Sequence, residues 1–123
     1  MKFLDSFSDL SYTAFRIVAG FLFLCHGSQK LLNFPAEFPY TLNAMTTSAG
    51  VIELVAGAMI IVGFYSRYAA FIASGTMAVA YWMVHGLNSV FPMNNGGELS
   101  ALYCFAFLYI AAKGPGMLSI NQK

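Results

Sequence analysis

The feature that most constrains this chain is a series of long apolar segments. A membrane-spanning helix needs roughly 20 mainly apolar residues, and three segments approach or reach that length: Tyr12–Leu32, Ser48–Tyr65 and Tyr68–Leu87. A fourth, Glu98–Ala112, is shorter, but the glycines and proline that follow it form a firm C-terminal stop. The sequence therefore predicts an all-α membrane protein, a four-transmembrane-helix bundle forming a single domain over residues 1–123.

The composition leads to the same class of protein. Hydrophobic residues make up 59% of the chain and charged residues only 9%, whereas soluble domains carry about 25% charged residues. A domain this small has too little interior to hide so much apolar surface from water. We therefore expect the lipid bilayer to cover it, and the net charge of +1 gives no basic footprint for nucleic acid.

The first apolar segment could also be a cleaved signal peptide, since Lys2 precedes it. Arg16 interrupts the apolar run, however, and no small-residue cleavage site follows Lys30. We expect residues 1–35 to stay in the mature protein.

The basic residues predict the orientation in the membrane. With four spans, both termini and the turn at Ser66–Arg67 share one side. That side carries Lys2, Arg67, Lys113 and Lys123, whereas the other side has only Lys30 near it, against Glu37 and Glu98. The positive-inside rule then places the N and C termini in the cytoplasm.

Ionisable residues within the spans are the candidate functional groups. Each costs roughly 2.5–3.5 kcal/mol to place in hydrocarbon, so such residues usually face the bundle interior and mark function. Helical geometry puts His26 and Glu53 roughly 9 Å below the outer ends of their helices, and His85 and Glu98 lie near the outer ends of theirs. We expect one outward-facing polar pocket. Its predicted catalytic residues are Glu53 and His26, and its predicted substrate-binding residues are Lys30, His85, Glu98 and Arg16.

Small residues share the helical faces that carry these charges. Gly20 and Gly27 fall on the stripe of Arg16 and Lys30, and Gly50 and Gly57 share a face with Glu53. Because small residues let membrane helices approach closely, these faces are expected to pack against neighbouring helices.

Structural explanations compete with function at most of these positions. Lys30 and Arg16 can extend to the membrane interface, Glu98 can complement a helix N-terminus, and either histidine can serve as a structural hydrogen-bonding group. Cys25 and Cys104 point away from the charged stripes, so we expect no disulfide between them.

In this order and spacing, the motifs resemble those of the DoxX family of small bacterial inner-membrane proteins. The residues that carry the resemblance extend over nearly the whole chain: Arg16, His26-Gly27-Ser28-Gln29-Lys30, Glu53, Arg67, Asn95-Gly96-Gly97-Glu98 and Gly114-Pro115-Gly116. The resemblance implies a four-helix bundle in the bacterial inner membrane that is often linked with redox enzymes, including a thiosulfate:quinone oxidoreductase.

Two main functions follow from these observations. The first is a redox-associated subunit of a membrane oxidoreductase whose pocket binds a quinone or a small anionic or thiol substrate, with electrons from a redox enzyme partner, since no flavin, haem-attachment or iron–sulfur motif is present. The second is a non-catalytic scaffold in which Arg16, Glu53 and Glu98 form buried ion pairs. A haem or metal site using His26 and His85 and small-solute transport by a homo-oligomer are further alternatives.

Overall fold

The computed structural model describes residues 1–123 and is entirely helical, which confirms the predicted all-α class. Its long helices are α2 (Ser8–Leu32), α3 (Ala44–Val62), α4 (Ser66–Ala80) and α6 (Glu98–Lys113), and each overlaps one predicted apolar segment. Ser66 and Arg67, predicted as a turn, form the start of α4 instead. Helix α4 continues directly into a π-helix, η1 (Tyr81–His85). Two one-turn helices, α1 (Lys2–Asp5) and α5 (Pro92–Asn95), lie in the N-terminal segment and in the loop before α6.

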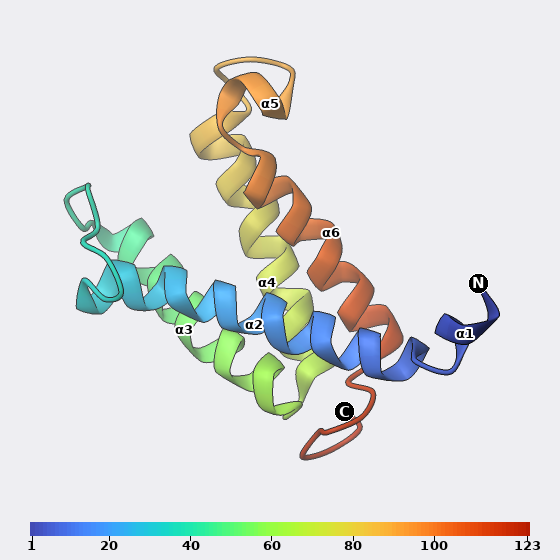
Figure 1. Ribbon diagram of the computed structural model, residues 1–123. Helices are drawn as coiled ribbons and strands as arrows, with labels where there is room; N and C mark the ends of the chain where they lie inside the picture. Colours follow the sequence, from blue (N-terminus) through green and yellow to red (C-terminus); the bar gives the residue numbers. More distant parts are fainter.

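The long helices form two hairpin-like pairs. Helix α2 packs along α3, and α4 packs along α6. The two pairs meet at the end of the molecule where the C-terminal segment lies and diverge toward the other end (Figure 1). We call these the closed end and the open end. The closed end contains Arg16 and residues 114–123, and the open end contains the loops that follow α2 and η1.

Glycine allows α2 and α3 to pack with their backbones almost in contact. A Cβ atom added to Gly27 would lie 2.5 Å from the amide nitrogen of Leu54, and one added to Gly57 would lie 2.8 Å from that of Leu24. The prediction that the glycine-bearing faces pack against a neighbouring helix is therefore confirmed for this pair.

Alanines and a serine perform the same task between α4 and α6. Ala69, Ala70 and Ala73 are buried, and the Ser74 hydroxyl donates to the carbonyl oxygen of Cys104 at 2.7 Å. Where the two pairs meet, large apolar side chains fill the space, and the rings of Phe23 and Phe107 lie 4.7 Å apart.

Local signals explain where α3 begins and ends. The Asn43 side chain accepts from the Thr46 amide while the Thr46 hydroxyl accepts from the Asn43 amide, both at 2.9 Å. This reciprocal capping satisfies two amides that helical bonding leaves free. Gly63 caps the C-terminal end of the helix, and its φ of 69° is the left-handed conformation that glycine adopts without strain.

The C-terminal segment joins the two helix pairs at the closed end. The amide of Ile120 donates to Val62 at 3.0 Å and that of Asn121 to Gly63 at 3.2 Å. Residues 120 and 121 thus pair with the end of α3 and the turn after it. The Arg67 guanidinium, from the first turn of α4, donates to the carbonyls of Ala111 and Ala112 at the end of α6.

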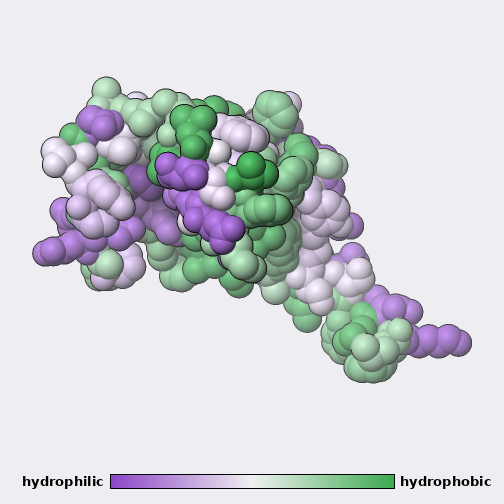
Figure 2. Space-filling model, turned by 90° about the horizontal axis from the view of Figure 1, so that it is seen from above, coloured by the Kyte–Doolittle hydropathy of each residue, from purple (hydrophilic) through white to green (hydrophobic).

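The outer surface is largely apolar. Figure 2 shows green hydrophobic residues over much of the visible face, with purple hydrophilic residues at its left side, near the centre of the view and at the tip of the lower right extension. Large side chains such as Phe21 and Phe105 are exposed on α2 and α6. By length and composition, α2 and α3 are each long and apolar enough to cross a membrane.

Candidate functional site

A cavity of about 900 Å³ opens between the two helix pairs toward the open end. It is bounded by α2 and α3 on one side, by α4, η1 and the first turns of α6 on the other, and by part of the loop after α2. Most of its lining is apolar, including Phe23, Phe38 and Phe71. Four of the residues predicted from the sequence line it: His26, Lys30, Glu53 and His85.

The centre of the site is an ion pair between α2 and α3. The Lys30 ammonium donates to both carboxylate oxygens of Glu53, at 3.0 and 2.8 Å. The Glu53 side chain is 4% exposed and that of Lys30 is 17% exposed, so the pair sits in the cavity wall rather than at the surface. Lys30 therefore binds a carboxylate within the fold instead of extending to the interface. Its ammonium also lies 5.7 Å from the ring centroid of Phe38.

His26 lies one helical turn from Lys30 on α2 and contacts the opposite pair of helices. Its ring meets that of Tyr103, on α6, edge to face at a centroid distance of 6.0 Å. Tyr103 is buried and also lines the cavity. Its hydroxyl has no hydrogen-bond partner.

His85 lines the cavity where η1 meets the loop before α6. It is the last residue of η1, and its Nδ1 lies 3.1 Å from the carbonyl oxygen of Asn95. The Asn95 side chain donates to the Tyr81 hydroxyl at 3.0 Å and accepts from the Gly97 amide at 2.8 Å. This network fixes the loop before α6, and with it the position of the His85 ring.

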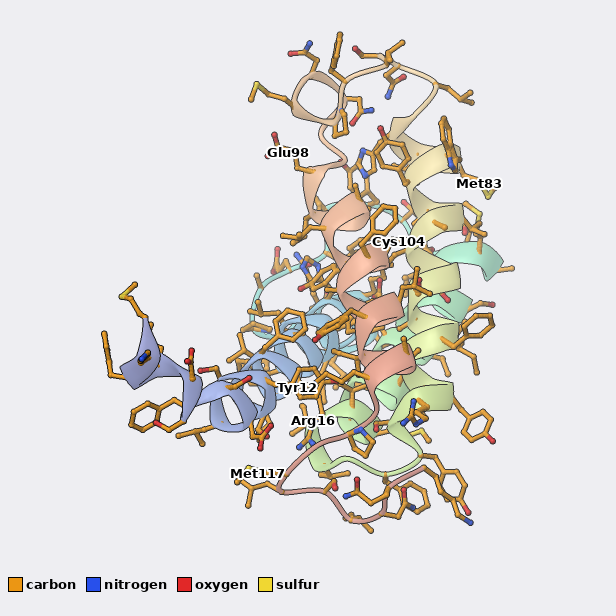
Figure 3. The ribbon with its side chains drawn as sticks, turned by 90° about the vertical axis from the view of Figure 1, so that its right-hand side faces the viewer. Tyr12, Arg16, Met83, Glu98, Cys104 and Met117 are labelled. Carbon is orange, nitrogen blue, oxygen red and sulfur yellow. The ribbon has the colours of Figure 1, made fainter.

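Glu98 does not share the cavity with the other predicted residues. It is exposed and lines a separate, smaller recess with Pro92 and Met93. Figure 3 shows Glu98 at the start of α6, on the side away from the cavity-lining Met83. The Glu98 side chain therefore does not converge on the cavity with the other predicted residues.

Arg16 is also separate from the cavity, because it lies at the closed end. It is fully buried, and its guanidinium donates to the carbonyl oxygens of Met117 at 2.9 Å, Leu118 at 2.8 Å and Ile61 at 3.2 Å, and also to that of Pro115. Figure 3 shows Arg16 beside Tyr12 and the C-terminal segment that carries Met117. The structure thus places Arg16 away from the other predicted substrate-binding residues, in a site that holds the C-terminal segment.

The structure explains why several of the short motifs occur together. Arg16 and Arg67 both donate to carbonyls at or near Gly114-Pro115-Gly116, so these three motifs build one site at the closed end. A Cβ atom on Gly114 would lie 2.6 Å from the Arg67 guanidinium, and the Gly114 φ of 97° also favours glycine. His26 and Lys30, the two ends of another motif, line the cavity instead, together with Glu53.

The ion pairs envisaged for a scaffold are not formed as expected. The salt bridge of the structure joins Lys30 to Glu53, and neither Arg16 nor Glu98 takes part in one.

Cys25 and Cys104 are both free thiols. No group of three or more His, Cys, Asp or Glu side chains is arranged to hold a metal ion.

Sequence reasoning missed Tyr103 as a cavity residue, and it named Asn95 only as part of a family motif, without its role in holding the loop. Tyr103 stands among apolar residues of α6, where a tyrosine is typical of ordinary packing. Asn95 lies in a loop rich in Asn and Gly, where turn formation alone accounts for it. Tyr103 gains its position from the packing of α6 against α2, and Asn95 gains its position from the contact of the loop with η1.

Comparisons with known proteins agree with the resemblance in the sequence. The family profile described as DoxX matches residues 11–86, which extend from α2 through η1. A protein of Haemophilus influenzae, named only as an uncharacterized protein, is 38% identical over 130 aligned positions that cover 100% of this chain and 97% of the relative. No solved structure matches the chain.

Proposed function

Because this chain belongs to the DoxX family of membrane proteins, we propose that its cavity binds a small lipophilic molecule with a polar headgroup, such as a quinone. We further propose that it acts as a membrane-embedded subunit of an oxidoreductase. The observation that carries this proposal is a cavity of about 900 Å³ with a mainly apolar lining and an ion pair in its wall.

The size and lining of the cavity favour this class of ligand. Ligand sites are typically concavities of about 300–1,000 Å³, mostly apolar, with a few polar groups that orient the ligand. Here Phe23, Phe38 and Phe71 offer apolar and aromatic contacts, while His26, Lys30 and Glu53 supply polarity. A polar solute would gain little from such walls, whereas a molecule with an apolar body and one polar ring would match both parts.

The redox role rests on family membership and on the chemistry of the cavity. Reduction of a quinone to a quinol consumes electrons and protons together. In this proposal the electrons come from a partner redox protein, and His26 and Glu53 are the residues at the cavity that exchange protons with the ligand. Co-purification of a flavin- or haem-containing protein with the tagged chain would support the partner.

We also propose that the protein crosses the membrane four times with both termini in the cytoplasm. Together α4 and η1 extend over residues 66–85, or roughly 30 Å at helical rise, which matches the hydrocarbon thickness. The closed end carries Arg67, Lys113 and Lys123, in keeping with the positive-inside rule. A green fluorescent protein fused to the C-terminus should fluoresce, and an alkaline phosphatase fused there should be inactive; the opposite result would reverse the orientation.

Ligand binding can be tested by blocking the cavity at Gly75. This residue lines the cavity, and a Cβ atom placed on it meets nothing within 4 Å. Gly75→Leu should therefore fill part of the cavity without disturbing helix packing. Ala58→Leu is the matched control, because Ala58 is exposed on α3 and does not line the cavity.

The measurement is calorimetric titration of the detergent-solubilised protein with a short-chain ubiquinone, with empty micelles subtracted. We expect saturable binding to the unmodified protein and to Ala58→Leu, and a loss of affinity of at least about tenfold for Gly75→Leu, equivalent to about 1.4 kcal/mol. If the unmodified protein shows no saturable binding, the proposed function is wrong. The completed ion pair at Lys30–Glu53 would then favour the scaffold role.

A further inference from the structure

The polar groups in the cavity wall differ in how much of their hydrogen-bonding capacity is already used. Lys30 and Glu53 bind each other through both carboxylate oxygens, and His85 is engaged with Asn95. The Tyr103 hydroxyl, in contrast, is buried without a partner, and the His26 ring, which contacts it edge to face, makes no side-chain hydrogen bond of the kind that His85 makes. The uncommitted groups are therefore neighbours, one from each helix pair.

The position of Tyr103 is fixed by its aromatic neighbours. Its ring stacks on that of Phe107 at 5.4 Å with an interplanar angle of 13°, and it meets Phe23 at 5.6 Å. Since Tyr103 is only 6% exposed, this packing keeps the ring from turning outward to find a partner for its hydroxyl. Buried hydroxyls almost always have a partner, because leaving one unpaired costs about 1–3 kcal/mol. A phenylalanine would fill the same space at no such cost.

Building on the proposed function, we propose that Tyr103 and His26 form the headgroup subsite of the cavity. The Tyr103 hydroxyl donates a hydrogen bond to a carbonyl oxygen of the ligand, and His26 provides the second polar contact. A carbonyl oxygen accepts two hydrogen bonds, so one oxygen can bind both side chains and link the two helix pairs through the ligand. The substrate class is thus a lipophilic ring carbonyl compound, as opposed to an apolar lipid or an anion.

The test compares Tyr103→Phe with Tyr109→Phe. Tyr109 lies on the same helix, is 52% exposed and is absent from the cavity lining, so its variant reports the loss of a hydroxyl alone. Each variant is titrated with a short-chain ubiquinone and with the corresponding substituted benzene, which lacks carbonyl oxygens. Thermal unfolding of the ligand-free proteins is recorded in parallel.

We expect Tyr103→Phe to weaken ubiquinone binding about tenfold, to leave binding of the substituted benzene unchanged, and to keep or raise the melting temperature of the ligand-free protein. Tyr109→Phe should change none of these. If the unmodified protein binds ubiquinone and Tyr103→Phe binds it equally well, the subsite is wrong while the proposed function stands. A melting temperature lowered by Tyr103→Phe, with unchanged affinity, would give the hydroxyl a structural role. If the unmodified protein does not bind ubiquinone at all, both proposals fail.

Discussion

The two ends of this molecule bury a cation in opposite ways. At the closed end, Arg16 is fully enclosed and donates to backbone carbonyls, with no carboxylate in contact. At the open end, Lys30 retains 17% exposure and binds the carboxylate of Glu53. The planar guanidinium offers five donors and suits several fixed carbonyls at once, whereas an ammonium is a compact charge. The comparison shows that the arginine joins segments together, while the lysine–glutamate pair lies in the wall of the cavity.

The largest expected effect comes from breaking the closed end. Arg16→Leu leaves the carbonyls of Pro115, Met117, Leu118 and Ile61 without their charged donor. Because hydrogen bonds to charged groups contribute roughly 1.5–3 kcal/mol each, we expect the free energy of unfolding to fall by more than about 3 kcal/mol. Size-exclusion profiles and thermal unfolding of the detergent-solubilised protein measure it. Arg16→Lys should recover part of the stability, since three donors replace five; full stability in Arg16→Leu would contradict the joining role.

At the open end the effect should be smaller, and reversible by a second change. Glu53→Leu leaves Lys30 unpaired, which costs about 3–5 kcal/mol in a fully buried pair. We expect roughly 2 kcal/mol here, because the Lys30 side chain is 17% exposed and so is not fully buried. Thermal unfolding of the single and double variants measures it. Lys30→Leu added to Glu53→Leu should restore most of the stability, because no unpaired charge remains. A double variant less stable than either single variant would contradict this explanation.

The glycine contacts beneath the ion pair provide a sharper test. A methyl group at Gly27 collides with the backbone of α3, so Gly27→Ala should push α2 and α3 apart and lower the free energy of unfolding by about 1–2 kcal/mol. Gly75→Ala is the matched control, since its added methyl group meets nothing and alanine favours a helix. Denaturation midpoints of both variants give the comparison, and equal losses would mean that close packing is not the cause.

The smallest expected effect lies at the start of α3, on the open-end side of the ion pair. Asn43→Ala removes the side chain that accepts from the Thr46 amide, which should cost about 1 kcal/mol. Hydrogen exchange should show faster opening at the first turn of α3 while the closed end keeps its protection. Faster exchange throughout the protein would instead make the cap a determinant of the whole fold.

The sequence predicted the helices far better than it predicted the site. Apolar length and turn residues are local signals, so each long helix and the glycine faces of α2 and α3 were found from the sequence. Glu98 was expected in the cavity but lies outside it, because the position of a residue along its helix does not reveal on which side the neighbouring helices pack. Arg16 could not be assigned to its partners, since backbone carbonyls exist at every residue and leave no mark in the sequence. Tyr103 gained significance only from the missing partner of its hydroxyl.

The distance along the chain between Arg16 and its partners has a consequence for biosynthesis. Pro115 follows Arg16 by 99 residues, so a ribosome synthesises all the long helices before three of the four residues whose carbonyls bind the guanidinium; the fourth, Ile61, belongs to α3. During that interval most of the guanidinium donors must be satisfied by water or lipid headgroups. We therefore expect α2 to reach its final depth in the membrane only late in translation, after α2 and α3 have already packed together.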